Sequence, residues 1–153
     1  PILNLTLDIT EVCMFKKILV AVDGSACSLL AASKAGDLAR ANGTADIYMV
    51  VAYDPIPSYL GEPILQSIID ARLDEAERVA EEGLRSLGQC KAKVHTEILQ
   101  GPAAEAILEV ARVREVDLIV VGSRGHGQLA TLILGSTSYK VVGNASCPVL
   151  VVR

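Results

Sequence analysis

A chain of 153 residues is long enough for one domain with a sizeable hydrophobic core. Its formal net charge of −4 argues against nucleic-acid and anionic-membrane partners, and with no Trp and a single Phe it lacks the aromatic platforms on which single-stranded nucleic acid stacks. No stretch reaches the ~18 apolar residues that a membrane span needs, and residues 1–13 lack the basic start and long apolar core of a secretory signal peptide.

Short apolar runs alternate with helical patterns along the whole chain. In chain order we predict a strand at 17–22, a helix ending at Asn42-Gly43, a strand at 46–52, a helix over 62–87, a strand at 92–99, a helix starting at Gly101-Pro102, a strand at 118–121, a helix over 136–143 and a strand at 149–152. Residues 1–13 are expected to be an extension outside the core, so that residues 14–153 form a single domain.

The predicted helices carry local signals of their own. Ser25 or Ser28 can cap the first helix, and Gly43 can end it in the left-handed conformation. The long helix has one apolar stripe at steps of three and four residues, made of Leu65, Ile69, Leu73, Ala76, Ala80, Leu84 and Leu87. Its other face is charged and offers two ion pairs at a spacing of four residues, Asp74 with Arg78 and Glu81 with Arg85, which indicates a solvated surface.

Strict alternation of aliphatic strands with helices predicts an α/β fold, in which a parallel sheet is covered by helices on both faces. In such sheets ligands bind beyond the carboxyl ends of the strands, near the point where the strand order reverses. Two of these ends carry suggestive residues, namely Asp23-Gly24-Ser25 after the first strand and residues 122–127 after the fourth.

Residues 121–136, VGSRGHGQLATLILGS, are the most informative segment. Gly122, Gly125, Gly135 and Ser136 follow the fourth strand in the spacing G-x2-G-x9-G-S and lead into a helix. Glycines let backbone N–H groups approach phosphate oxygens, and a helix N-terminus adds a positive end. The segment has no P-loop lysine, so P-loop chemistry is not expected. The alternative interpretation is a loop whose glycines serve only tight turns.

The cysteines predict a cytoplasmic location. Cys13, Cys27, Cys90 and Cys147 form no C-x-x-C pair, and the two histidines lie far apart in the chain, so no zinc site is expected. We interpret the cysteines as free thiols of a reducing compartment.

These residues resemble the universal stress protein family, in its nucleotide-binding branch. Residues 15–25, FKKILVAVDGS, are similar to the family's opening strand and turn, and residues 117–125, DLIVVGSRG, to its fourth strand and loop. Gly135-Ser136 and residues 147–152, CPVLVV, are similar to its closing helix and strand. The resemblance covers essentially all of 14–153. It implies a Rossmann-like fold with a five-stranded parallel sheet of order 3-2-1-4-5, and the G-x2-G-x9-G-S spacing distinguishes the members that bind ATP.

The resemblance also implies roles for single residues. Asp23 is expected to accept hydrogen bonds from ribose hydroxyls or to lie near the magnesium ion that the nucleotide carries, and an Asp that caps a turn is the alternative. The backbone of Ala52 is expected to meet the edge of the adenine ring. The complete set of expected nucleotide-binding residues is Ala21, Val22, Asp23, Ala52, Gly122, Ser123, Arg124, Gly125, His126, Gly127, Gly135, Ser136 and Thr137.

The glycine segment is expected to hold the charged part of the ligand. Gly122 would let the sugar and phosphates approach, and Gly125 would hold the phosphate chain. Gly135 and Ser136 would bind the terminal phosphates. Arg124 can pair with a phosphate, and His126 can donate to a phosphate or act as a weak acid or base. For both side chains, simple exposure in a loop is the alternative.

The chain offers no nucleophile with an adjacent base and no paired catalytic carboxylates, so binding with slow hydrolysis or none is expected. The resemblance implies a regulatory module of the stress response that binds ATP with its Mg²⁺ and acts on an unknown protein partner. It also implies a homodimer formed through the flat edge strand at 149–152. The alternatives are a slow ATPase or self-phosphorylating protein, a nucleotide-independent scaffold or chaperone, and AMP or a cyclic nucleotide as the ligand.

Overall fold

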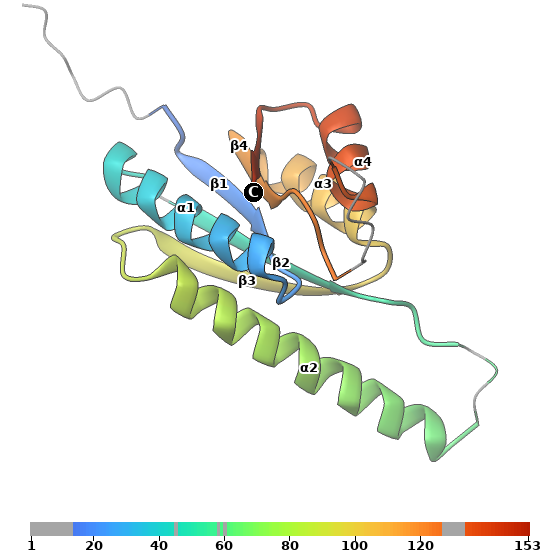
Figure 1. Cartoon of the computed structure of the whole chain (residues 1–153). Coiled ribbons are helices and arrows are strands. Elements are labelled where there is room, and N and C mark those ends of the chain that lie inside the picture. The colour runs from blue at the N-terminus through green and yellow to red at the C-terminus, as the bar shows by residue number, and fades with distance from the viewer. Residues whose placement is uncertain (1–13, 45, 58, 60, 127–133) are drawn as a thin grey trace, which may run out of the picture.

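The computed structural model describes residues 14–44, 46–57, 59, 61–126 and 134–153. Strands and helices alternate along these residues (Figure 1). In chain order they are β1 (Lys17–Ala21), α1 (Ala26–Asn42), β2 (Asp46–Tyr53), α2 (Ile64–Leu87), β3 (Lys93–Gln100), α3 (Ala103–Arg114), β4 (Leu118–Gly122), α4 (Ser136–Asn144) and β5 (Val149–Val152). Every element predicted from the sequence is present, with ends that differ by one or two residues.

The strands form one parallel sheet in the order β3-β2-β1-β4-β5, which confirms the predicted topology. Val20 of β1 lies between Met49 of β2 and Val120 of β4. The chain builds outward from β1 to β2 and β3, then returns to add β4 and β5 on the other side. The strand order therefore reverses between β1 and β4, where a parallel sheet opens a crevice at its carboxyl edge.

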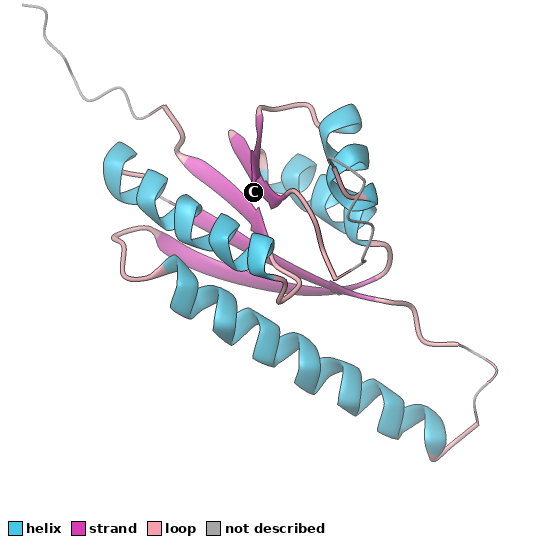
Figure 2. Cartoon of the chain, in the orientation of Figure 1, coloured by secondary structure: helices cyan, strands magenta, loops and turns pink. Residues whose placement is uncertain are grey.

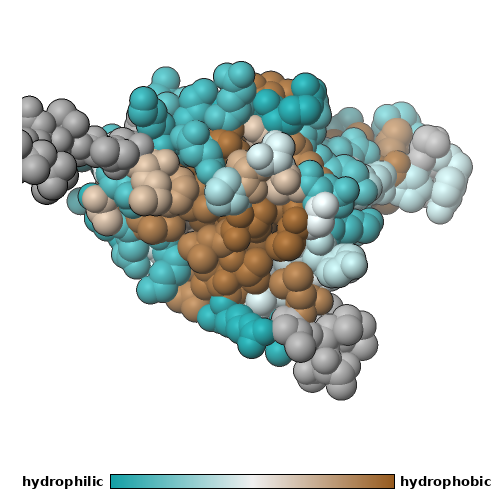
Figure 3. Space-filling model, turned by 90° about the horizontal axis from the view of Figure 1, so that it is seen from above, coloured by the Kyte–Doolittle hydropathy of each residue, from teal (hydrophilic) through white to brown (hydrophobic). Residues whose placement is uncertain are grey.

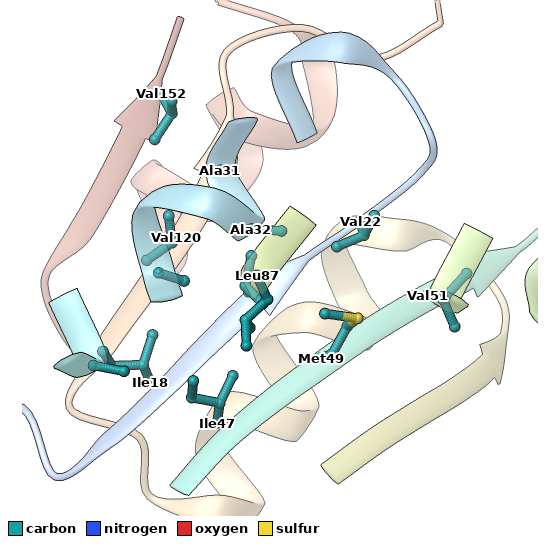
Figure 4. Close-up of a cluster of buried hydrophobic side chains, with 14 of the residues drawn as sticks. Ile18, Val22, Ala31, Ala32, Ile47, Met49, Val51, Leu87, Val120 and Val152 are labelled. Carbon is teal, nitrogen blue, oxygen red and sulfur yellow. The ribbon is translucent and has the colours of Figure 1, made fainter. Parts of the chain in front are cut away.

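Helices cover both faces of the sheet (Figure 2). Helices α1 and α2 pack on one face over side chains such as Ile18, Ile47 and Met49, and Figure 4 shows this cluster. Helices α3 and α4 pack on the other face over Leu19 and Ile119. The central strands β1, β2 and β4 are apolar on both faces and largely buried, as their near-continuous aliphatic runs predicted, whereas the edge strand β3 is partly exposed and carries polar residues.

The ends of α1 follow their sequence signals. Of the two candidate serines, Ser25 is the N-cap, and its side chain accepts a hydrogen bond from the backbone N–H of Ser28. Gly43 ends the helix with φ of 64°, a left-handed conformation that glycine adopts without steric cost. These caps fix the start of α1 directly behind the turn that follows β1.

The long helix α2 departs from its predicted stripe at one position. Leu84 is exposed, and Gly83 takes the buried place instead. A Cβ atom on Gly83 would lie 2.9 Å from Sδ of Met49, so even a methyl group there would require the Met49 side chain to shift. On the charged face, Arg85 pairs with the predicted Glu81 at 3.9 Å, whereas Arg78 pairs with Glu75 rather than with the predicted Asp74. No helix among the described residues, α2 included, is long and apolar enough to span a membrane.

Candidate functional site

A pocket of about 320 Å³ opens at the carboxyl ends of β1 and β4, where the strand order reverses. Its volume lies in the range of small-molecule sites. The walls come from the turn after β1, the end of β4 with the loop that follows, and the starts of α3 and α4. The lining residues are Ala21, Val22, Asp23, Ser28, Ala103, Val121, Gly122, Arg124, Gly125, His126, Gly135, Ser136, Thr137 and Ser138.

Most of the described residues expected from the sequence line this pocket, but two do not. Ala52 lies near the end of β2, opposite Leu99 of β3, and its contact with an adenine ring stays a prediction. Ser123 is buried beneath the pocket; its N–H donates to the carbonyl of Val152 at 2.6 Å and its own carbonyl accepts from Gly135 N–H at 2.7 Å. Gly127 lies outside the described residues.

Other lining residues were not expected to bind a ligand. Ala103 begins α3, far along the chain from the glycine segment. The rule that all carboxyl ends of a parallel sheet meet at one edge could have indicated it. Ser138 of α4 is 5% exposed and donates to the carbonyl of Gly122 at 2.6 Å, which ties α4 to the end of β4. The buried Ser138 hydroxyl therefore serves packing, and its modification would require α4 to move.

The N-terminus of α4 faces the pocket without a side-chain cap. Its N-cap residue is Gly135, which has no side chain, and the first helical hydrogen bond runs from Tyr139 N–H to the Gly135 carbonyl. The first N–H groups of the helix, including those of Ser136 and Thr137, precede that bond and have no partner within the helix. They carry the positive end of the helix dipole, which favours an anion in the pocket.

Two glycines allow close approaches around the pocket. A Cβ atom on Gly122 would lie 2.7 Å from the carbonyl carbon of Cys27, so this glycine lets the end of β4 pack against the start of α1. A Cβ atom on Gly125 would lie 2.6 Å from Oδ2 of Asp23. Gly125 therefore brings the loop backbone against the carboxylate of Asp23. Neither role was visible from the spacing of the glycines.

The carboxylate of Asp23 is partly used by the turn itself. Its Oδ1 accepts hydrogen bonds from the N–H and the hydroxyl of Ser25, at 2.9 and 2.5 Å. The turn-capping alternative for Asp23 is thus present in the structure. Gly24, with φ of 81°, makes the turn possible. Oδ2 is the oxygen on the side of Gly125, at the pocket.

Arg124 and His126 have different surroundings. The side chain of Arg124 is exposed at the pocket and forms no ion pair with any described residue. His126 is instead held by the turn after β1, because its Nε2 lies 2.6 Å from the carbonyl oxygen of Asp23. A carbonyl only accepts, so Nε2 carries the proton. Among the described residues, the pocket thus presents to a ligand the cationic side chain of Arg124 and the N-terminus of α4.

Comparisons with known proteins agree on one family. The family model described as the universal stress protein family matches residues 14–153. A universal stress protein encoded in the QAH/OAS sulfhydrylase 3′ region of Thermus aquaticus is 46% identical over 140 residues, which cover 92% of this chain and all of that protein. The structure of the universal stress protein UspA from Lactobacillus plantarum superposes with a TM-score of 0.79 at 27% identity, over 90% of this chain and 97% of that one. A universal stress protein solved in complex with cAMP gives a TM-score of 0.60 at 27% identity, over 91% and 97% of the two chains.

Proposed function

The chain belongs to the universal stress protein family, and we propose that it is a regulatory module of the stress response that binds ATP, with the Mg²⁺ the nucleotide carries. The observation that carries this proposal is the uncapped N-terminus of α4, which faces the pocket behind Gly135. Backbone N–H groups at such a terminus suit phosphate oxygens and need no lysine. A nucleotide is also the class of ligand held by the relative solved with cAMP.

The pocket residues fit the parts of a nucleotide. Ser136, Thr137 and the guanidinium of Arg124 suit the phosphates. Oδ2 of Asp23 is left to accept from ribose hydroxyls, since Oδ1 is held by Ser25. The apolar ends of β1 and β2, near Val22 and Ala52, suit the adenine ring.

The second candidate ligand is AMP or a cyclic nucleotide. The relative in complex with cAMP favours it, and backbone donors respond to negative charge rather than to the number of phosphates. Among the described residues that line the pocket, the single carboxylate is Asp23, and it is engaged in the turn. We therefore propose a binding protein with slow hydrolysis or none, which acts in the cytoplasm through a protein partner.

A homodimer formed through β5 is part of the proposal. β5 is an edge strand of the sheet. The outer backbone N–H and C=O groups of an apolar edge strand have no partner in the sheet, and they can pair with a strand of a second molecule. Figure 3, seen from above relative to Figure 1, shows a broad apolar area bounded by polar residues. The elements on that side, α4 and β5, carry the exposed side chains of Tyr139, Val142 and Leu150. An apolar surface of this kind supports association with a second copy.

Calorimetric titration with Mg-ATP, AMP and cAMP tests the proposed ligand. We expect the wild type to bind and Gly125→Val to lose binding, because the new side chain would displace the loop from Asp23. Gly61→Val is the matched control, since a Cβ there would meet nothing within 4 Å. If Gly125→Val binds as tightly as the wild type, the glycine segment does not bind the phosphates. If the wild type binds none of the three nucleotides, the scaffold alternative is favoured.

A further inference from the structure

The helix whose N-terminus faces the pocket is fastened to the sheet by the side chain of Ser138. Ser138 lies in the first turn of α4, and its hydroxyl donates to the carbonyl oxygen of Gly122 at 2.6 Å. Gly122 is the last residue of β4. The hydrogen bond therefore joins the end of β4 to the start of α4, and the two residues that form it both line the pocket.

This hydrogen bond is sheltered from solvent and uses the proton of the hydroxyl. Ser138 is 5% exposed, so water competes little for the bond. A serine hydroxyl has one proton, and here the carbonyl of Gly122 accepts it. The lone pairs of Oγ that remain can only accept hydrogen bonds, and the oxygens of an ionised phosphate also only accept. Ser138 therefore does not donate to a phosphate while this bond is formed.

Backbone hydrogen bonds complete the junction beside Ser138. The N–H of Gly135 donates to the carbonyl of Ser123 at 2.7 Å, and the N–H of Ser123 donates to the carbonyl of Val152 in β5 at 2.6 Å. Any residue with a backbone N–H could form these two bonds. Ser138 adds to them a bond that depends on its side chain, and a substitution can therefore remove it.

The position of α4 on the sheet determines where its free donors point. The N–H groups of Ser136 and Thr137 precede the first hydrogen bond within the helix, and both residues line the pocket. A hydrogen bond weakens steeply when its angle departs far from linear. If the helix is held on the sheet before a ligand arrives, these donors are already aimed, and binding costs less ordering.

We propose that Ser138 is a positioning residue, which holds the N-terminus of α4 against β4 so that its N–H groups are in place for the phosphates of a nucleotide. The inference rests on the proposed function of the pocket. Without the hydroxyl, a ligand has to restore the arrangement of α4 and β4 when it binds. One net hydrogen bond corresponds to a factor of about two to ten in an equilibrium constant, so phosphate ligands should bind more weakly by about this factor.

Ser138→Ala tests the inference, with Thr44→Val as the matched control. The hydroxyl of Thr44 also belongs to a buried residue and donates to a backbone carbonyl, that of Phe15, at 2.7 Å, but Thr44 does not line the pocket. Both variants lose one such bond, so we expect similar decreases in Tm. Calorimetric titration should show ATP and AMP binding about two- to tenfold more weakly to Ser138→Ala, and adenosine, which has no phosphate, changed by less than about twofold. Thr44→Val should bind all three ligands as the wild type does.

Amide hydrogen exchange in the ligand-free protein separates a positioning role from direct contact with the ligand. The N–H of Gly135, which donates to Ser123, should exchange about two- to tenfold faster in Ser138→Ala than in Thr44→Val. Equal exchange rates together with weaker ATP binding would make Ser138 a direct ligand contact. Unchanged affinity for ATP and AMP would mean that the bond serves stability alone.

Either of these two results overturns the inference while the proposed function stands. If the wild type binds no nucleotide, the proposed function fails and the inference fails with it. Faster exchange at Gly135 in Ser138→Ala would then show that Ser138 is a structural tie between α4 and β4.

Discussion

The two carboxylate oxygens of Asp23 have different surroundings, which explains why the sequence allowed both a ligand contact and a turn cap for this residue. Oδ1 caps the turn through Ser25, while Oδ2 lies against Gly125 at the pocket. A single side chain can therefore shape the turn and still present an acceptor to a ligand. The same division explains Ser123, whose place in a glycine-rich segment indicated ligand contact but whose polar groups are used by Val152, Gly135 and the thiol of Cys27.

The positive charge of Arg124 should contribute to the affinity for an anionic nucleotide. Arg124→Gln removes the one cationic side chain in the pocket that forms no ion pair with a described residue. We expect ATP to bind about tenfold more weakly, the size expected for a lost charge-assisted hydrogen bond, with no change in Tm. Titrations at low and high salt should show the loss shrinking as salt screens the charge. An unchanged affinity for ATP would mean that the Arg124 side chain faces solvent and does not contact the ligand.

Cys147 should make stability depend on pH. Burial, together with the nearby charge of Asp117, raises the pKa of this thiol in the folded protein. The pKa of the thiol is higher in the folded protein than in the unfolded chain. The stability that the protonated thiol contributes is therefore complete below the ordinary thiol pKa of about 8.5, and it is lost as pH rises through the pKa of the folded protein. Urea unfolding across this range should show the stability difference between wild type and Cys147→Ala falling at alkaline pH. A difference that is constant with pH would contradict this account.

At the scale of elements, glycines set how closely the helices approach their neighbours. A Cβ atom on Gly36 of α1 would overlap the carbonyl oxygen of Leu87, at the end of α2. Arg40 completes this junction by donating to the carbonyls of Leu87 and Gln89, at 3.2 and 3.0 Å. The crossing of α1 and α2 therefore depends on a position without a side chain.

Gly36→Ala should destabilise the protein by about 1–3 kcal/mol, because the methyl group forces the two helices apart. Gly143→Ala is the matched control in α4, where a Cβ would meet nothing within 4 Å. That change should stabilise by about 0.5–1 kcal/mol through helix propensity. Urea unfolding of both variants measures the difference, and equal stabilities would mean that the α1–α2 junction adjusts freely.

The sequence was informative about elements because their signals are local. Aliphatic runs predicted the strands β1, β2, β4 and β5, and an alternating pattern predicted β3. Gly43 and the serines predicted the ends of α1. Contacts between elements were harder to predict: Leu84 fits the helical stripe as well as Gly83 does, and only the position of Met49 decides between them. The place of Ala103 in the pocket was equally hard to predict, because an alanine gives no indication of ligand contact and only the arrangement of the elements puts it there.

At the scale of the whole molecule, the topology gathers the polar residues of distant segments at one edge of the sheet. The turn after β1 and the loop after β4 meet because these strands are neighbours at the reversal of strand order. The apolar surface that includes Leu150 lies at a different place, on the edge strand β5. The ligand pocket and the proposed dimer contact are thus connected through α4 and through the hydrogen bond that Ser123 N–H donates to the carbonyl of Val152 in β5.

Leu150→Glu should convert the proposed dimer into a monomer. Leu150 is 38% exposed on the edge strand, and a carboxylate there would be buried without a partner in a β5–β5 contact. Size-exclusion chromatography with light scattering should show half the mass of the wild type, with an unchanged circular dichroism spectrum. Ile64→Glu, at the exposed start of α2, is the matched control and should leave the mass unaltered. If Leu150→Glu has the same molar mass in solution as the wild type, β5 does not form a dimer interface.

The central claim is that the pocket between β1 and β4 holds an adenine nucleotide. The most direct measurement is to denature freshly purified protein and identify the released small molecules by chromatography and mass spectrometry, with Gly125→Val purified in parallel. We predict ATP in near-stoichiometric amount from the wild type and none from the variant. An equal amount from both proteins, or no nucleotide from the wild type together with no binding of added Mg-ATP, would contradict the account.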